Sequence, residues 1–322
     1  MCIRDSNCPV VIMSGHGTVD TAVEATRLGA FDFVEKPLSL AKLLRTVEAA
    51  LESSSKVPAG APSMLPPLLT PVGRSKLMHQ LREKVQQYAR HEQHVLISGE
   101  PGSGRGAFAR YLHGLSRRAD EPLISITAAS LTESNAEEQL CGREADGEIT
   151  AGAFERAAKG TLVIDDLADL NEAAQKVLLA TLEDGVYRRV NGHDNVRLEA
   201  RIVATVRADY DALVEKGTLR RHLVAQLSVL ALKVPPLRDY SEDVPELLAY
   251  NVDKLVDAER LTFRRFSVAA QNLLRNNTCP DNVRELKNLV RRLMLTGSDY
   301  DITLEEVESE IASAAPTEEP LY

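Results

Sequence analysis

Apolar residues in the first part of the chain form two short continuous runs and two segments with helical spacing. Residues 9–14 and 31–34 are apolar runs typical of short buried strands. Each is followed by a segment with apolar residues three and four apart, at 18–28 and 39–51, which predicts a helix. This unit is too short to close a hydrophobic core of its own. Three consecutive serines and five prolines in residues 53–71 then indicate a linker.

The rest of the chain has the pattern of a parallel sheet followed by a helical region. Four apolar runs, at 95–97, 122–126, 160–166 and 200–205, lack alternation of apolar and polar residues. Such runs are typical of parallel strands that helices cover on both faces. From residue 236 onward the pattern is helical. Because ligands of parallel sheets bind at the carboxyl ends of the strands, chemistry is expected there.

The composition changes this picture little. The chain has 322 residues, of which 44% are hydrophobic and 26% charged, as in ordinary globular proteins of more than one domain. A net charge of -9 argues against a broadly basic nucleic-acid surface. No apolar run approaches the ~18 residues that span a membrane, and the four cysteines show no metal or disulfide spacing. We therefore expect a reduced cytoplasmic protein with no membrane partner.

A glycine-rich turn follows the apolar run at 95–97 and precedes a helical segment. Its Gly-x-x-x-x-Gly spacing, between a strand and a helix N-terminus, predicts a phosphate-binding loop, because backbone N–H groups and the helix dipole attract anions there. The expected nucleotide-binding residues are Gly99, Glu100, Pro101, Gly102, Ser103, Gly104, Arg105 and Gly106. Arg105 stands where such loops carry lysine, and Gly106 where a Ser or Thr hydroxyl would hold magnesium. The alternative is a turn that binds nothing.

Several stretches between residues 69 and 295 make this region resemble the AAA+ domain of NtrC-type bacterial enhancer-binding proteins, which act with the sigma-54 factor. The matching stretches are Gly99-Glu100-x-Gly102-x-Gly104, 160–166, 175–179, 182–185, 234–238 and 282–286. The resemblance implies an α/β AAA+ domain with an α-helical lid, with ATP and Mg²⁺ as cofactors. The activity that it implies is ATP hydrolysis coupled to remodelling of the sigma factor.

The same resemblance assigns roles to two acids. Asp165 matches the acid that organises magnesium, and Asp166 stands where a glutamate polarises the attacking water. Aspartate is one methylene shorter, and a misplacement of about an ångström can lower a rate on the order of a hundredfold. The alternative is that both acids simply end a strand at the surface.

Four further positions are compared with the family pattern. Arg207 falls where the family has a polar sensor residue. Arg220 matches the first of two arginines at the subunit interface, while Gln226 takes the place of the second. Arg284 matches the sensor arginine of the lid and is expected to bind nucleotide. We take Asp166 and Arg220 as the candidate catalytic residues and Asp165 as the candidate metal ligand.

The opening segment resembles the second half of a response-regulator receiver domain. Ser14 matches the hydroxyl that senses the phosphoryl group, Phe33 the aromatic switch, and Lys36 the lysine that pairs with the phosphoryl. The phosphate-accepting aspartate of that family would lie upstream of residue 1. The partner that this implies for the full-length protein is a sensor histidine kinase.

The largest departure from the family concerns the loop that engages the sigma factor, where the family carries Gly-Ala-Phe-Thr-Gly-Ala. Residues 138–142 align with the helix before this loop and 152–157 with the helix after it. Only residues 143–151 remain, too few for the usual protruding hairpin, so we expect the sigma-54 contact to be lost. The family's DNA-binding helix-turn-helix would follow the end of the chain.

These features together predict a fold and a domain order. The expected segments are a partial flavodoxin-like receiver (1–53), a linker (54–71), the α/β nucleotide-binding subdomain (72–235), the helical lid (236–312) and a disordered tail (313–322). We expect a self-associating transcription regulator, as a dimer or hexameric ring, with a weakened ATPase. One alternative is a non-enzymatic assembly module, and another is an active ATPase that uses Arg105 in place of lysine.

Minor polar groups complete the expectations. The arginine pairs at 264–265 and 291–292 are expected on the lid surface. His91 and His94 are expected at a solvated helix end.

Overall fold

The computed structural model describes residues 11–14, 32–35, 70–145 and 147–314, and the chain divides into two compact units, Met1–Leu65 and Pro66–Tyr322. In the first unit, β1 (Val11–Ser14) pairs in parallel with β2 (Asp32–Glu35). Both strands were predicted from the apolar runs. Ser14 ends β1 and Phe33 lies within β2. Lys36, the two helices predicted before residue 53, most of the linker and the tail from residue 315 lie outside the described residues.

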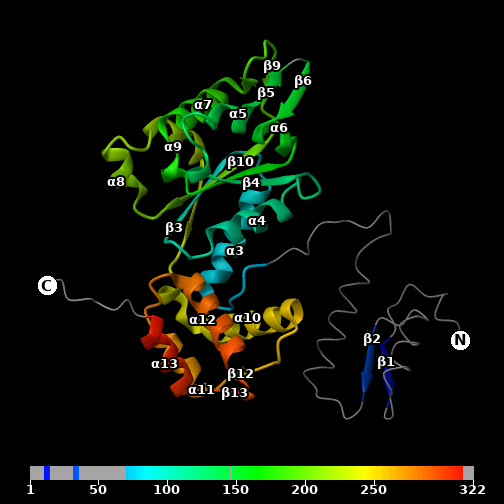
Figure 1. Cartoon of the computed structure of the whole chain (residues 1–322), viewed down its shortest axis with the longest axis vertical. Helices are drawn as coiled ribbons and strands as arrows, with labels where there is room; N and C mark the ends of the chain where they lie inside the picture. The colour runs from blue at the N-terminus through cyan, green and yellow to red at the C-terminus, as the bar shows by residue number, and fades with distance from the viewer. Residues whose placement is uncertain (1–10, 15–31, 36–69, 146, 315–322) are drawn as a thin grey trace, which may run out of the picture. The chain divides into compact units, whose positions relative to one another are not determined.

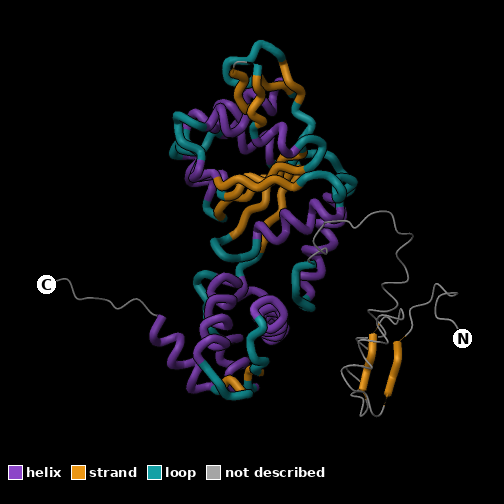
Figure 2. Tube along the Cα trace, turned by 45° about the vertical axis from the view of Figure 1, so that its right-hand side comes forward, coloured by secondary structure: helices purple, strands orange, loops and turns teal. Residues whose placement is uncertain are grey.

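A five-stranded parallel sheet forms the centre of the second unit (Figures 1 and 2). Its strands lie in the order β11 (Leu230–Val234), β3 (Val95–Gly99), β10 (Arg201–Arg207), β7 (Thr161–Asp165) and β4 (Leu123–Thr127). The four predicted apolar runs are β3, β4, β7 and β10. The edge strand β11 was not predicted, because its buried and exposed residues alternate and do not form a continuous apolar run. The predicted α/β class is confirmed.

Helices cover both faces of this sheet. Val95 and Ile97 of β3 pack on one side with α3 (Lys76–Ala89) and α4 (Arg105–Leu115). Leu96, between them, packs on the opposite side, because successive side chains of a strand point to opposite faces. The helices of that side are α5 (Ala136–Cys141), α6 (Ala153–Ala157), α7 (Glu172–Asp184) and α9 (Arg221–Leu227), with α8 (Tyr210–Glu215) beyond the end of β10.

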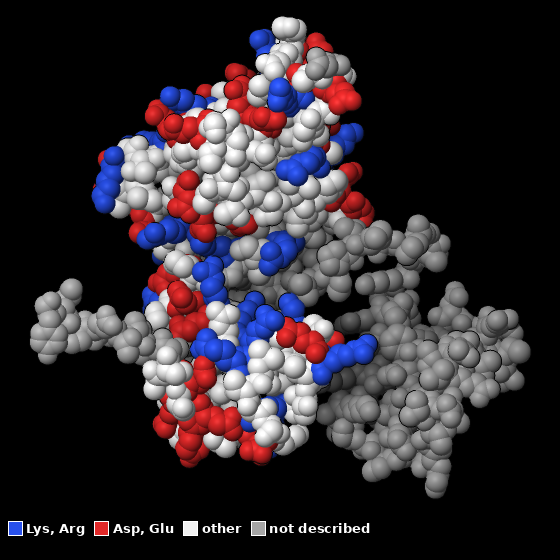
Figure 3. Space-filling model, in the orientation of Figure 1, with Lys and Arg blue, Asp and Glu red and all other residues white. Residues whose placement is uncertain are grey.

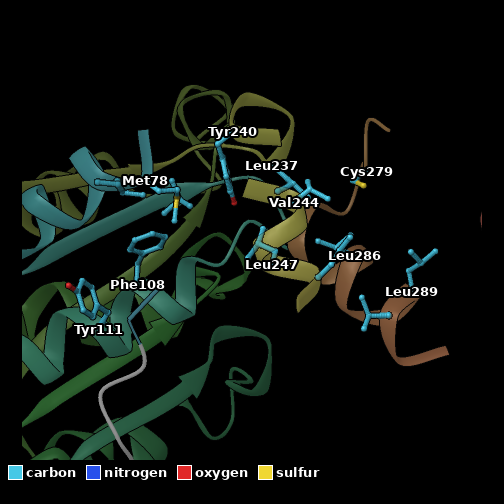
Figure 4. Packing of buried hydrophobic residues seen from close by; sticks show 14 of the residues in the cluster. Met78, Phe108, Tyr111, Leu237, Tyr240, Val244, Leu247, Cys279, Leu286 and Leu289 are labelled. Carbon is cyan, nitrogen blue, oxygen red and sulfur yellow. The ribbon is translucent and has the colours of Figure 1, made fainter. Parts of the chain in front are cut away.

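The helical lid contacts the α/β part through a shared core (Figure 4). Met78 of α3 and Phe108 of α4 belong to the same buried cluster as Tyr240, Leu247 and Leu286 of the lid. The lid consists of η4 (Leu237–Asp243), α10 (Val244–Glu259), β12 (Arg265–Phe266), α11 (Val268–Asn276), α12 (Asn282–Thr296), β13 (Asp301–Ile302) and α13 (Leu304–Ala314).

The start of α3 is also tied to the lid. The hydroxyl of Ser75 caps α3 by accepting a hydrogen bond from Met78 N–H at 3.2 Å. The same hydroxyl donates to the Asp243 carboxylate at 2.6 Å, and Arg74 and Ser75 N–H groups donate to it at 2.8 Å each. Asp243 is 3% exposed, so this carboxylate joins the two parts from within.

One predicted surface residue is buried in the lid. Arg264 is only 1% exposed, which corrects the expectation that it lies on the surface. Its guanidinium donates to the Glu306 carboxylate and to the carbonyl of Leu293. The apolar stem and five donors of arginine allow this, because every buried donor can find an acceptor on the surrounding chain. Arg265 and Arg291 are exposed, as predicted, and Arg292 is half-buried.

Two short hairpins lie on the side of the sheet that carries α5 and α7. β5 (Gly142–Ala145) and β6 (Glu148–Ala151) form the first, and β8 (Val186–Arg188) and β9 (Asn195–Arg197) form the second. The backbones of Glu144 and Val190 join them through an N–H to carbonyl hydrogen bond of 2.9 Å. The segment at 143–151, predicted to be too short for the usual protruding hairpin, therefore lies within a compact hairpin in which Ala145 pairs with Glu148.

None of the helices among the described residues is long and apolar enough to cross a membrane.

Candidate nucleotide-binding site

The glycine-rich loop lies between the end of β3 and the start of α4, as predicted. Gly102 and Gly104 have φ values of 73° and 99°, which glycine adopts without strain. A side chain at 102 is also excluded by space, because its Cβ would lie 2.0 Å from the carbonyl oxygen of Asp281. Gly104 is the N-cap of α4, and its carbonyl accepts from Ala107 N–H at 2.8 Å. The loop therefore presents a helix N-terminus beside the lid.

The lid holds the loop through polar contacts. Arg238 binds Glu100 with two hydrogen bonds, of 2.8 and 2.5 Å. Asn282, fully buried, donates to Glu100 at 3.2 Å and to the Pro101 carbonyl at 3.0 Å. Arg284 N–H donates to the Gly102 carbonyl at 3.3 Å. The bonds from Arg238 and Asn282 lower the pKa of Glu100 to about 2, so its carboxylate is committed to the lid.

The two acids lie at the carboxyl end of one strand, since Asp165 is the last residue of β7 and Asp166 follows it. Asp165 accepts hydrogen bonds from Ser125 Oγ at 2.8 Å and from Thr205 Oγ1 at 3.3 Å. Asp166 has a left-handed backbone, with φ 57°, and its N–H donates to Thr205 Oγ1 at 3.0 Å. Thr205 is 2% exposed and lies in β10, between β3 and β7. One buried hydroxyl thus positions both acids next to the phosphate loop.

Asp166 forms an ion pair with the arginine of the loop. Asp166 Oδ1 lies 2.5 Å from Arg105 Nη2, and the side chains are 36% and 8% exposed. The pair is close in distance but lacks the angle of a hydrogen bond, and Arg105 Nη1 has no hydrogen-bond partner in the described part of the chain. The cation of the loop and the second acid of the strand therefore neutralise each other.

A cleft of about 450 Å³ joins most of these groups. Of the predicted site residues, the following line it: Gly102, Gly104, Arg105, Gly106, Asp165, Asp166 and Arg284. A second cavity of about 120 Å³ shares Gly104 and the start of α4, and has apolar walls from Val72, Phe108, Tyr240 and Leu247. Such a pair of spaces, one polar and one apolar, has the chemistry to take a phosphate tail and a base.

Comparisons with known proteins decide the family. A profile described as the sigma-54 interaction domain matches residues 71–233, and one described as the AAA+ ATPase lid domain matches residues 238–321. The chain is 35% identical over 315 residues to the nitrogen assimilation regulatory protein NtrX of Azorhizobium caulinodans, covering 96% of this chain and 69% of that protein. The chain belongs to the NtrC-type family of sigma-54 activators.

Other members of this family agree. The transcriptional regulator NtrC of Rhizobium meliloti is 34% identical over 314 residues, which cover 96% of this chain and 64% of that protein. Crystal structures of NtrX from Brucella abortus match with TM-scores of 0.70 in complex with ADP and 0.69 in complex with ATP, at 32% and 31% identity. They cover 96% and 94% of this chain, and 71% and 72% of the NtrX chain. The chain spans about two thirds of the length of its curated relatives.

The remaining predicted residues of this NtrC-type chain lie away from the cleft. Gly99, Glu100 and Pro101 do not line it, and the Ser103 side chain is buried beside the apolar cavity. Arg220 precedes α9 and pairs with Glu172 of α7 at 2.8 Å. Its neighbour Gln226 is exposed on α9.

Arg207, which was noted in the sequence, is exposed and lies 3.2 Å from Asp209. Sequence reasoning missed three cationic residues that line the cavities, namely Arg110, Lys254 and Lys287. The spacing of Arg110 to Gly106, four residues along one helix, could have indicated it. Lys254 and Lys287 depend on how the lid packs, which no local pattern predicts. Lys and Arg side chains gather between the α/β part and the lid on the face that Figure 3 shows.

The cleft offers few ligands for magnesium. The described residues contain no group of three or more His, Cys, Asp or Glu side chains that could hold a metal ion. Magnesium in nucleotide sites uses one or two carboxylates, the loop hydroxyl and the phosphates. Gly106 supplies no hydroxyl, and the Asp166 carboxylate is paired with Arg105. Of the two acids that line the cleft, Asp165 has no ion pair with any described residue.

Proposed function

We propose that this chain is the nucleotide-binding part of a two-component response regulator of the sigma-54 activator type, in which ATP or ADP binds weakly and hydrolysis is near background. The observation that carries the proposal is the ion pair between Arg105 and Asp166. It joins the two positions on which charge neutralisation and activation of water depend in the family. That NtrX of Brucella abortus crystallises with ADP and with ATP supports nucleotide binding by the same fold.

The residues that remain support binding. The loop backbone surrounds a helix N-terminus, and Arg284 lines the cleft that opens above it. Arg105 retains a positive charge, although as a planar fork and not as the compact ammonium of lysine. Losing the lysine contact removes a charge-assisted hydrogen bond of about 1.5–3 kcal/mol. Asp165 is the candidate ligand should magnesium enter with the nucleotide.

The substitutions should lower the rate of ATP hydrolysis more than they lower the affinity for nucleotide. In-line attack on a γ-phosphate needs a positioned water and positive charge around the transferred group. Asp166 is shorter than the family's glutamate and is engaged by Arg105. Gln226, exposed on α9, is neutral where the family has an interface arginine, and such arginines contribute on the order of 10³ to 10⁵ in rate.

We also propose that the contact with sigma-54 is lost. The hairpin of β5 and β6 stands where the family has its sigma-54 loop, and its strands pair as far as Ala145 and Glu148, which supports this proposal. Self-association, as a dimer or hexameric ring, would bring Arg220 to a neighbouring copy. For the longer protein, we propose a sensor histidine kinase as the input partner and DNA binding through a domain beyond this chain.

The test combines ATP and ADP binding by calorimetry with steady-state ATP turnover. We expect weak binding and near-background turnover in the wild type. Arg105→Lys should tighten ATP binding and leave turnover low. Turnover should rise appreciably only when Asp166→Glu and Gln226→Arg are added.

Two outcomes would contradict the proposal. No binding of either nucleotide would favour a purely structural assembly module. Turnover of about one per second or faster in the wild type, within the usual enzyme range, would show that Arg105 replaces lysine in function.

A further inference from the structure

Arg110 occupies the space beside the missing hydroxyl of the phosphate loop. A Cβ placed on Gly106 would lie 3.7 Å from Arg110 Nη1 and 3.9 Å from Asp165 Oδ1. Residues four apart on a helix share a face, and helical side chains lean toward the N-terminus. The Arg110 side chain therefore lies back over the bare surface that Gly106 leaves. Its guanidinium stands at the side of the site where a metal-binding hydroxyl would otherwise project.

Two lysines of the lid add positive charge at the same place. Arg110 and Lys287 line both the polar cleft and the apolar cavity, and Lys254 lines the latter. None of the three is in an ion pair with a carboxylate in the described part of the chain. Desolvation, then the charges of Lys254 and Arg110, lowers the pKa of Lys287. All three residues are exposed, so water screens part of their mutual repulsion, and an anion bound in the cleft would neutralise them further.

The two carboxylates that could bind a metal already have other partners. Each carboxylate oxygen of Asp165 already accepts a hydroxyl hydrogen bond, and Asp166 is held by Arg105. Magnesium requires near-ideal octahedral geometry and gives up its water reluctantly. The residues present therefore do not fit a tightly held Mg²⁺ ion, whereas guanidinium groups fit phosphate oxygens directly.

From this we infer that nucleotide binds to this chain without Mg²⁺, and that Arg110 and Lys287 supply the positive charge that the metal supplies in other phosphate loops. The inference rests on the proposed nucleotide binding and specifies how its charge is balanced. The ligand class is a nucleoside di- or triphosphate as the free anion.

The experiment is calorimetric titration of the whole chain with ADP, once with excess EDTA and once with millimolar MgCl₂. We expect dissociation constants that differ by less than about threefold. In EDTA, Arg110→Gln and Lys287→Gln should each weaken binding about tenfold, as expected for loss of one charge-assisted contact. Arg291→Gln, which removes the same charge from an exposed position of α12 outside both cavities, is the matched control and should leave the constant unchanged.

A gain-of-function variant sharpens the test. Gly106→Ser restores a hydroxyl, and its Cβ meets only ordinary van der Waals contacts. Magnesium should tighten ADP binding to this variant more than to the wild type. A wild-type dependence on Mg²⁺ of about tenfold or more would overturn the inference and leave the proposed function intact. Absence of binding with EDTA and with Mg²⁺ would instead contradict the proposed function itself.

Discussion

Arg105 Nη2 lies 2.5 Å from Asp166 Oδ1, so the two residues that depart from the phosphate loop and the acidic strand of the family contact each other. Arg105 opens α4, and Asp166 follows β7. A buried arginine needs a counter-charge, and the left-handed backbone at Asp166 directs the short carboxylate to it. The two substitutions are therefore compatible as a pair, whereas either alone would leave a charge of the site without its partner.

Removing the charge of Asp166 should have opposite effects on binding and on stability. In Asp166→Asn, Arg105 loses its anionic partner, and nucleotide phosphate becomes the best one available. We expect ADP to bind several-fold more tightly in calorimetry. Urea unfolding should show a loss of about 1–3 kcal/mol, since breaking such a pair leaves a buried charge uncompensated.

The matched control for this prediction is Asp209→Asn. It removes the same charge from an exposed pair with Arg207 at the end of β10, and it should change neither quantity measurably. If Asp166→Asn weakens ADP binding, the pair prepares the site for nucleotide and does not compete with it.

Much of the central fold could be predicted from the sequence because its signals are local. Continuous apolar runs identify β3, β7 and β10, which helices cover on both faces. The turn at Gly102 and Gly104 could be predicted from spacing alone. Strand β11 could not, because its buried and exposed residues alternate.

The parts of the site that could not be predicted depend on packing between distant segments. Nothing local indicates that Arg105 would meet Asp166. Arg264 was expected on the surface and is buried, because Glu306 and backbone carbonyls satisfy its donors. His94 was expected at a solvated helix end, but its ring accepts a hydrogen bond from Ile202 N–H at 3.0 Å. In each case the partner lies far along the chain, where pattern and spacing carry no information.

The bond between Glu100 and Arg238 should hold the lid on the phosphate loop. We expect Arg238→Ala to increase amide hydrogen exchange at the start of α12, where Asn282 and Arg284 contact the loop. The effect follows because the bidentate bond is lost and Asn282 alone retains Glu100. Arg74→Ala, which removes an exposed pair with Glu246 of the same lid, is the control.

The pH dependence of this bond follows from the depressed pKa of Glu100, about 2. A carboxyl whose folded pKa is depressed contributes fully above its unfolded value of about 4.3 and loses its contribution as the pH falls through the folded one. Exchange at the start of α12 should therefore be insensitive to Glu100 between neutral pH and about pH 5. A rise in exchange already at pH 6 in the wild type, abolished by Glu100→Gln, would contradict this assignment.

The compact hairpin of β5 and β6 should not support a complex with sigma-54. The strands of the hairpin pair as far as Ala145 and Glu148, and Ile149 is its one large apolar side chain that is strongly exposed among the described residues. We expect no co-elution of the chain with sigma-54 in size-exclusion chromatography with ADP and a transition-state mimic of the γ-phosphate. A family member that carries the Gly-Ala-Phe-Thr-Gly-Ala loop is the positive control. Stable co-elution of this chain would show that another surface replaces the loop.

His94 should make the fold sensitive to mild acid. Its Nδ1 accepts the hydrogen bond from Ile202 N–H, so the neutral ring is required. Desolvation, with smaller contributions from Arg201 and Arg118, lowers its pKa from 6.5 to about 4. The unfolded chain therefore binds this proton more readily than the folded one does. The stability that neutral His94 gives is complete above pH 6.5 and is lost progressively as the pH falls from there to about 4.

We expect this loss to amount to about 2 kcal/mol between pH 7 and pH 4, measured by urea unfolding at each pH. Burial also lowers the pKa of His113, so that residue adds to the wild-type slope in the same direction. Comparison with His94→Gln isolates His94, because glutamine keeps an acceptor for Ile202 N–H and does not titrate. His79→Gln, at an exposed position of α3, is the matched control and should keep the wild-type slope. Equal slopes for the wild type and His94→Gln would show that His94 carries no acid sensitivity.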